Sequence, residues 1–216
     1  GGESLEIETE VHGWPGHKPG QFAFLTADAT DGAHPYTIAS DWREEIPRIT
    51  FVVRKLGDHT QRLLERLRVG QAVKVEGPYG RFTFDDDCAR QIWIGGGIGI
   101  TPFIGRMKHM AGYTEEQDWP EGQQIDLFHS TADVDNEALD KLAGDAKSAD
   151  VRLHVLIDAR DGWLTGARLR AAVPEWREAS ICFCGPPGFG KALRRDLARQ
   201  GFPVGQRFHQ ELFAMR

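Results

Sequence analysis

The sequence predicts two domains of different class, a small antiparallel β-barrel over residues 1–86 and an α/β domain with a parallel sheet over residues 87–216. Short strand segments separated by turn residues fill the first part, whereas strand and helix segments alternate through the second. Glycine accounts for 25 of the 216 residues, about 12% against a usual ~7%. The positions of these glycines are the main evidence about function.

Many short strands and a single helix make up the first part, a combination that favours a barrel. Thr60 is the expected N-cap of the helix, Leu63, Leu64 and Leu67 share one of its faces, and Gly70 ends it. The first strand segment alternates strictly and has no methionine before it, so the alternative that the barrel is truncated at its N-terminus stays open. The expected strands are 5–11, 21–25, 36–39, 48–53 and 72–76.

The second part reads as successive βαβ units and therefore as a parallel sheet. An acidic run at 85–87 marks the expected hinge between the domains. The expected strands are 91–94, 125–129, 151–157, 180–184 and 208–213. One expected helix begins at Thr101, and three others cover 135–142, 165–172 and 189–199.

Composition excludes several classes of protein. There are 26 basic and 32 acidic residues, which gives a net charge of −6 and no positive excess of the kind that a nucleic-acid binder carries. No apolar stretch approaches the ~18 residues of a membrane span. Cys88, Cys182 and Cys184 lack the spacing of a metal site, and we expect reduced thiols, no metal and a cytoplasmic location, since no signal peptide precedes the first strand.

A glycine-rich loop lies between a strand and a helix at 95–102. Gly95, Gly96, Gly97 and Gly99 allow a sharp turn and a close approach of the backbone to a ligand. Pro102 suits the first turn of a helix, whose N-terminus favours an anion such as a pyrophosphate. The alternative is a tight turn without a ligand.

A second turn rich in glycine and proline follows the fourth strand of the α/β domain, at Cys184, Gly185 and Pro186. Ligands of open α/β sheets bind outside the carboxyl ends of the strands. Two such turns at that edge predict one cleft with an extended ligand, although this segment alone is also typical of an ordinary proline-rich turn.

Three further segments are weak signals when each is taken alone. One places His34, Pro35, Tyr36, Thr37 and Ile38 on a strand of the barrel. The other two read as an N-cap and as a turn closing the barrel. The N-cap segment contains Gly57, Asp58 and Thr60, and the turn segment contains Gly77, Tyr79 and Gly80.

Together and in this order, the five segments resemble the ferredoxin–NADP reductase superfamily, and most closely the dehydrogenase domains of ferric reductases and NADPH oxidases. Those domains carry His-Pro-Phe/Tyr-Thr-Ile, Gly-Asp-x-Thr, Gly-Pro-Tyr-Gly, Gly-Gly-Gly-Ile-Gly-Ile-Thr-Pro and Cys-Gly-Pro-Pro. The similarity runs from Lys18 to the C-terminus. It implies FAD on the barrel, NADPH or NADH on the α/β domain, and an oxidoreductase that passes hydride from the nucleotide to the flavin.

The resemblance also implies roles for single residues. Tyr36 lies against the flavin ring, and Thr37 hydrogen-bonds near flavin N5. His34 stands where many members have arginine and faces the FAD phosphate, a weaker contact because imidazole lacks the guanidinium fork. The other implied FAD contacts are Pro35, Ile38, Gly57, Asp58, Thr60, Gly77 and Tyr79.

On the nucleotide side, the resemblance assigns the pyrophosphate to the glycine loop and the nicotinamide to the second turn. Phe213 is the implied cover of the flavin's other face, with a core phenylalanine as its alternative, and Glu211 helps to polarise the site. The implied nucleotide contacts are Gly95, Gly96, Gly97, Gly99, Thr101, Cys184, Gly185 and Pro186, and the implied catalytic residues are Thr37, Cys184, Glu211 and Phe213.

The choice between NADPH and NADH stays open at this point. The ribose 2′ position is expected just after the second strand of the α/β domain, where Ser130 and Thr131 suit a phosphate but no arginine follows. Asp133 suits a free 2′-hydroxyl instead.

The resemblance places the electron acceptor outside this chain. We expect a haem-bearing membrane domain, with this chain at the cytoplasmic face of the membrane as part of a longer ferric-reductase-like protein. The alternatives are a free-standing reductase for a ferredoxin, a flavodoxin or an oxygenase, and a non-enzymatic nucleotide-binding subunit.

Overall fold

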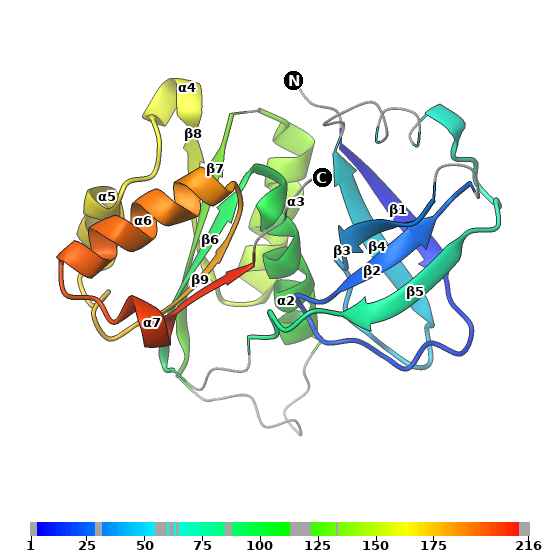
Figure 1. The fold of residues 1–216 in the computed structure, drawn as a ribbon, viewed down its shortest axis with the longest axis horizontal. Helices are drawn as coiled ribbons and strands as arrows, with labels where there is room; N and C mark the ends of the chain where they lie inside the picture. The colour runs from blue at the N-terminus through cyan, green and yellow to red at the C-terminus, as the bar shows by residue number, and fades with distance from the viewer. Residues whose placement is uncertain are drawn as a thin grey trace. The chain divides into compact units, whose positions relative to one another are not determined.

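The computed structural model describes residues 4–28, 32–54, 60, 63, 65–84, 88–112, 122–132 and 134–211 and forms two compact units (Figure 1). Gly1–Thr83 and Thr101–His109 make the first unit, and Phe84–Ile100 and Met110–Arg216 make the second. The first is built on antiparallel sheets and the second on a parallel one, which confirms the predicted fold class. The domain boundary at 86/87 stays a prediction, and the segment 101–109 groups by its contacts with the first unit.

Two antiparallel sheets form the first unit. One pairs two strands and the other orders three as β3-β2-β5. A bridge between Ile38 and Phe51 links the two sheets, so the strands follow one another as in a small barrel. The strands are β1 (Ser4–Glu10), β2 (Phe22–Thr26), β3 (His34–Thr37), β4 (Arg48–Arg54) and β5 (Lys74–Tyr79).

The core of this unit follows the alternation of the strands. Ala23 and Leu25 of β2 and Ile49, Phe51 and Val53 of β4 are almost fully buried in one cluster. The β-branched and aromatic residues of β4 suit a pleated, buried surface. Burial of this face supplies most of the driving force that holds the two sheets together.

The prediction of a turn at Gly77–Gly80 is wrong for most of its length. Gly77, Pro78 and Tyr79 belong to β5, and Tyr79 pairs with Phe22 of β2. Proline lacks the N–H that a central strand needs, but β5 lies at the edge of its sheet and tolerates it. An irregularity between Phe22 and Phe24 absorbs the change of register.

The helix expected after Thr60 is described only in part. Thr60, Leu63, Glu65 and Arg66 are helical, and the N–H of Leu67 donates to the carbonyl of Leu63 at 2.9 Å. Gly57, Asp58 and Leu64 lie outside the described residues.

The second unit is a parallel sheet of five strands in the order β10-β9-β6-β7-β8. All five predicted strands are present; residues 212 and 213 of the last predicted strand lie outside the described residues. The chain adds strands on one side of β6 and then returns to its other side, so β6 and β9 flank the point where the order reverses. The strands are β6 (Arg90–Gly96), β7 (Gln124–Thr131), β8 (Arg152–Ile157), β9 (Ser180–Cys184) and β10 (Phe208–Glu211).

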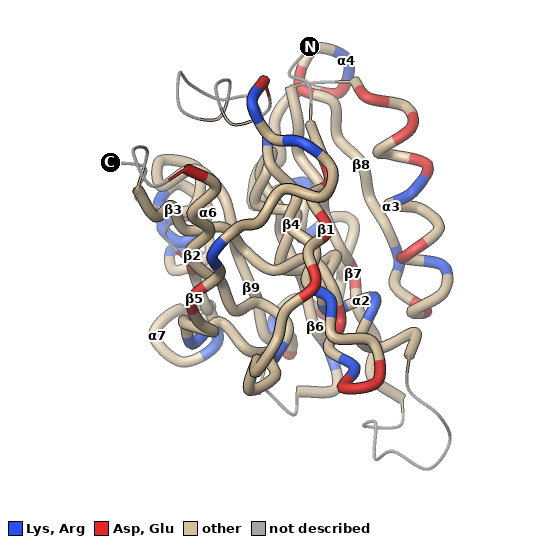
Figure 2. The backbone as a smooth tube through the Cα atoms, turned by 90° about the vertical axis from the view of Figure 1, so that its right-hand side faces the viewer, with Lys and Arg blue, Asp and Glu red and all other residues tan. Residues whose placement is uncertain are grey.

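The predicted helices of this unit are confirmed; α3 and α6 are longer than predicted, α5 begins one residue later, and η1, α4 and α7 are short additions. Asp135 caps α3 by accepting a hydrogen bond from the N–H of Ala138 at 3.1 Å. Acidic and basic residues alternate along α3 (Figure 2), which indicates a solvated face. The helical segments are η1 (Gly97–Ile100), α2 (Thr101–Ala111), α3 (Asn136–Ser148), α4 (Asp158–Asp161), α5 (Gly166–Ala172), α6 (Pro187–Arg199) and α7 (Val204–Arg207).

Helices α5 and α6 pack on one face of this sheet through Leu169 and Leu193, and α3 lies on the opposite side (Figure 1). At the amino end of the sheet a fully buried carboxylate, Asp126, contacts Arg90 and His154 at 2.6 Å each. The negative charge of Asp126 on β7 is thus compensated by side chains of the two neighbouring strands, β6 and β8. Within the described part of the chain, every helix is too short or too polar to cross a bilayer.

Candidate functional site

The glycine-rich segment at the end of β6 packs so closely that side chains cannot fit. Gly95 and Gly96 belong to β6, so the predicted loop begins only at Gly97. A Cβ on Gly99 would overlap the carbonyl of Cys184, and one on Gly96 would come within 2.9 Å of Pro186 Cδ. The loop turns at once into η1 and then into α2. These glycines therefore serve close packing between two strand ends, and they leave the loop's own backbone groups as its only polar atoms.

The structure brings both predicted nucleotide segments of the second unit together. Gly95 pairs in register with Cys184, and Gly185 approaches Gly96 so closely that a Cβ would lie 3.0 Å from its Cα. Both segments follow the carboxyl ends of β6 and β9, where the strand order reverses. Ligands of open α/β sheets bind at this point.

Two further predicted residues extend this edge. Ser130 and Thr131 end β7, and Ser130 pairs in register with Gly96. Gly97 begins η1, and Thr101 begins α2 with 2% of its surface exposed. Because 101–109 belongs by its contacts to the first unit, the predicted role of Thr101 in nucleotide binding stays a prediction.

The sequence analysis missed Asp158 at the end of β8. The Ser130 hydroxyl donates to Asp158 Oδ1 at 3.2 Å, so a carboxylate stands beside the residue that we expected to meet the ribose. An acidic residue directly after a strand, at the carboxyl edge of a parallel sheet, was the available signal.

The exposed aromatic residue Trp163 was also missed. It follows α4 and is 76% exposed, which is unusual for a tryptophan. The Arg168 guanidinium holds the carbonyls of Gly162 and Trp163, each at 3.2 Å, and so fixes the backbone on which the indole stands.

A buried carboxyl lies next to Cys184 at the same edge. Glu211 of β10 pairs in register with Cys184, and burial raises the pKa of Glu211 to about 7. Burial and the neighbouring Glu211 both raise the pKa of the Cys184 thiol. Glu211 Oε2 has no hydrogen-bond partner among the described residues, and Phe213 lies outside them. Cys184 is therefore an uncharged thiol, and Glu211 keeps its proton below about pH 7.

The flavin strand predicted in the first unit is β3. Thr37 is only 4% exposed, yet its hydroxyl has no hydrogen-bond partner in the described part of the chain. Burial raises the pKa of Tyr36 to about 12, so the phenol is neutral. His34 is partly exposed and Pro35 is exposed, whereas the Ile38 side chain is fully buried in the core, which leaves only its backbone for a ligand.

The remaining predicted flavin residues are spread over the first unit. Tyr79 is 46% exposed and packs on Phe22 and Phe24, with ring centroids 5.8 and 5.6 Å apart. A Cβ on Gly77 would lie 3.1 Å from Trp14. The contacts of these residues with a cofactor stay predictions.

The fit of FAD to the first unit rests on Thr37. A buried hydroxyl without a partner carries an unfavourable free energy of about 1–3 kcal/mol that a polar ligand atom removes. It stands on the strand that the motif assigned to flavin N5. The donor set of the unit therefore suits the cofactor.

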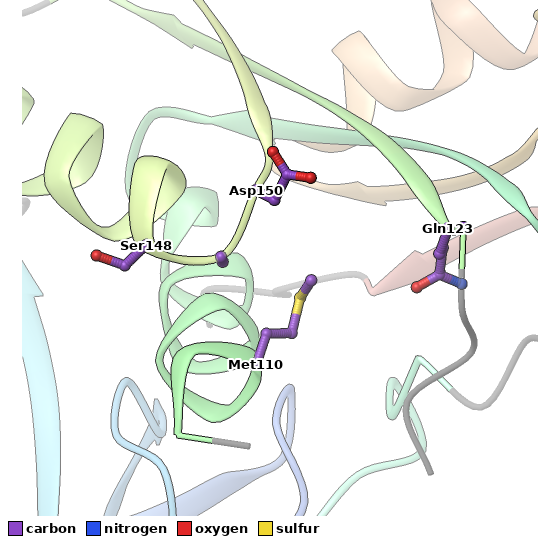
Figure 3. Close-up of a pocket in the computed structure, with 6 residues that line it drawn as sticks. Met110, Gln123, Ser148 and Asp150 are labelled. Atoms are coloured by element: carbon purple, nitrogen blue, oxygen red, sulfur yellow. The ribbon is translucent and has the colours of Figure 1, made fainter. Parts of the chain in front are cut away.

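A cavity of about 300 Å³ lies at the other end of the sheet of the second unit (Figure 3). Gln123 precedes β7, and Ser148 and Asp150 precede β8, so the cavity is at the amino ends of the strands. It is separate from the glycine loop, and no predicted site residue lines it.

The first unit carries the family resemblance that its motifs predicted. Residues 5–84 match the family model described as the oxidoreductase FAD-binding domain. The match spans the strands of the first unit. The match agrees with the FAD predicted on this unit.

The chain is similar to reductase components of oxygenase systems. It is 28% identical to the glycine betaine monooxygenase reductase subunit of Chromohalobacter salexigens, over 91% of this chain and 56% of the relative. It is 29% identical to NADH-cytochrome b5 reductase 1 of Ajellomyces capsulatus, over 64% of this chain and 48% of the relative. The chain thus spans about half the length of these relatives.

Solved structures share the fold at low identity. A cytochrome P450 reductase of Amycolatopsis superposes with a TM-score of 0.78 at 22% identity, over 97% of this chain and 65% of that one. Ferredoxin-NADP+ reductase of Plasmodium falciparum gives 0.77 at 15%, over 98% and 89%.

We predict that Gly99→Ala destabilises the second unit by roughly 1–3 kcal/mol, because the added methyl meets backbone that cannot move aside. Urea unfolding measures the change. Gly188→Ala is the matched control, since a Cβ there meets nothing within 4 Å inside α6, and we expect unchanged stability or a gain of up to ~1 kcal/mol. Equal effects of the two substitutions would contradict the close packing of the loop.

The raised pKa of Glu211 predicts that the stability of the protein depends on pH. The pKa of this carboxyl is raised from 4.5 to about 7 in the folded protein, so its contribution to stability is complete below pH 4.5 and is lost as the pH rises to about 7. Glu211→Gln removes this loss. The free energy of unfolding of the variant relative to wild type should therefore increase between pH 4.5 and 7 and then level off.

Urea unfolding at a series of pH values checks this, with the exposed Glu178→Gln as control. A difference between Glu211→Gln and wild type that is constant across this range would refute a buried, protonated Glu211.

Proposed function

We propose that this chain is the NAD(P)H-oxidising module of an electron-transfer system. It takes a hydride from a nicotinamide nucleotide onto FAD and releases the two electrons singly to an acceptor outside the described residues. The observation that carries the proposal is the meeting of the glycine loop with the Cys184–Pro186 turn at the point where the strand order reverses.

The residues of the chain supply binding, orientation and proton control, and FAD, when bound, supplies the conversion of a two-electron donor into one-electron steps. Backbone N–H groups of the loop after β6 bind the pyrophosphate. The Thr37 hydroxyl donates to the flavin edge near N5. Cys184 borders the nicotinamide as a neutral thiol, so it adds no negative charge beside the ring that gives up the hydride.

The acceptor belongs to one of two settings. The five motifs favour a haem-bearing membrane domain of a ferric-reductase-like protein, as the sequence predicts. The relatives from Chromohalobacter salexigens and Rhodococcus jostii, which are named as reductase components of monooxygenases, favour an oxygenase component as the acceptor. The described residues contain no cluster of three or more potential metal ligands, and both settings place the acceptor elsewhere.

An anaerobic titration tests the proposal. The full chain is reconstituted with FAD, NADH or NADPH is added, and the loss of flavin absorbance is followed by stopped flow. We expect bleaching that saturates with nucleotide. A chain that binds FAD but is bleached by neither nucleotide, or that cannot hold FAD at all, would overturn the proposal in favour of a non-enzymatic nucleotide-binding subunit.

Thr37→Val is the matching variant, because valine keeps the shape and removes the hydroxyl. Removing a buried polar atom without a partner should leave the free energy of unfolding unchanged or slightly raised. The rate of bleaching should fall by about 10-fold, the effect of one well-placed hydrogen bond of ~1.4 kcal/mol.

We further propose that the nucleotide is NADH. The Ser130 hydroxyl donates its hydrogen bond to Asp158, so it has no proton left to donate to a 2′-phosphate. The carboxylate would also repel the phosphate of NADPH, whereas it accepts a hydrogen bond from the free 2′-hydroxyl of NADH. Trp163 is exposed close to this strand end in sequence and suits stacking on the adenine.

Asp158→Asn tests this choice. The amide keeps an acceptor for Ser130 but removes the charge, so the ratio of kcat/KM for NADH over NADPH should fall about 10-fold or more. Steady-state kinetics with an artificial acceptor measures the ratio. Asp150→Asn, which removes an exposed carboxylate at the amino end of the sheet, is the control and should leave the ratio unchanged.

A further inference from the structure

We infer that His129 is a positioning residue for dinucleotide binding, which acts by holding the carbonyl of Gly95 near the end of β6, where the glycine segment begins. No sequence motif contains this histidine. The inference deepens the proposed function and rests on it, because it concerns the same nucleotide site.

His129 lies on β7, the strand next to β6, and pairs in register with Gly95. Its ring is 7% exposed, and Nδ1 lies 3.2 Å from the Gly95 carbonyl oxygen. A carbonyl oxygen has no proton to give, so Nδ1 is the donor in this contact and carries the hydrogen. The contact therefore fixes the tautomer of the ring as well as its orientation.

A histidine is the exception at this place in the strand. Strands of a parallel sheet covered on both faces are nearly continuous runs of apolar residues. Ile125 and Leu127, which share the face of His129 by alternation, are 4% and 0% exposed. A polar ring in this row must be compensated by hydrogen bonding, and one compensating group is the loop's own carbonyl.

The loop needs such a neighbour because it has almost no side chains of its own. Gly95, Gly96, Gly97 and Gly99 have more conformational freedom to lose than any other residue type. On the β9 side the backbone of Cys184 and the ring of Pro186 block movement. On the β7 side the strand ladder holds Gly95 and Gly96, and the His129 side chain adds a contact to the Gly95 carbonyl.

A loop held on both flanks has its N–H groups in the binding arrangement before the ligand arrives. Less conformational entropy is therefore lost when a pyrophosphate binds. Loss of the His129 contact should consequently weaken the binding of every ligand that carries the pyrophosphate. The chemical step, which takes place at the nicotinamide, should keep its rate.

Two substitutions of equal size and branching isolate the hydrogen bond. His129→Asn places an amide N–H near the position of Nδ1, and His129→Leu has the same shape without a donor. Calorimetric titration of the full chain with ADP-ribose, which contains the pyrophosphate but no nicotinamide, gives Kd. Steady-state kinetics of the FAD-loaded chain with NADH gives KM and kcat separately.

We expect His129→Leu to raise Kd for ADP-ribose and KM for NADH by about 3- to 10-fold, the effect of one net hydrogen bond, with kcat unchanged. His129→Asn should restore both constants to within about twofold of wild type. If the leucine variant does not fold, His129→Ala replaces it in the same comparison.

Equal Kd values for the asparagine and leucine variants, whether tight or weak, would overturn the inference, and so would a loss confined to kcat. A wild-type chain that binds neither ADP-ribose nor NADH would instead overturn the proposed function itself, and this inference with it. Tight binding by wild type and by both variants would overturn the role of His129 alone.

Discussion

The second unit depends on a close approach of two backbone segments, the loop after β6 and the turn after β9. Gly99 faces the Cys184 carbonyl, and Gly96 faces Gly185, with no room for a Cβ at either contact. This contact requires glycine on both strands, and it requires β6 and β9 to be neighbours, as the sheet order provides. The excess of glycine in the sequence is therefore, at this edge, a packing requirement that also exposes backbone N–H groups to a ligand.

Two buried polar atoms at the predicted sites are poorly compensated, because no group in the described residues forms a hydrogen bond with them. The Thr37 hydroxyl and the Glu211 carboxyl each lack a partner for one oxygen. Such groups lower stability, and folded proteins satisfy nearly all of them. One lies on the strand that the motif assigned to the flavin, and the other lies beside the cysteine assigned to the nicotinamide. Thr37 and Glu211 are both residues that the resemblance had singled out for chemistry, and a functional site is where a protein is expected to accept such a loss of stability.

Sequence alone predicted the elements whose signals are local. The period-2 segments of β2 and β4 and the capped helix α5 at Thr165 follow from neighbouring residues. The Gly77–Tyr79 segment could not be predicted in this way, because its pairing with β2 involves residues more than 50 positions away, and a Gly-Pro pair locally favours a turn. Asp158 was missed for the same reason, since its partner Ser130 is 28 residues distant and the contact exists only once β7 and β8 are side by side.

The end of β7 shows how one strand can serve two demands of nucleotide binding. His129 points its donor to β6 and acts on the loop, while the next residue, Ser130, turns its hydroxyl to Asp158 after β8. Adjacent residues of a strand face opposite sides of the sheet, so the two hydrogen bonds do not compete. In the proposed function the first contact acts on the pyrophosphate site, which NADH and NADPH share, and the second acts on the ribose site, where they differ. Affinity and specificity are therefore assigned to separate side chains, and a change at Asp158 should alter the choice of nucleotide without loosening the loop that His129 holds.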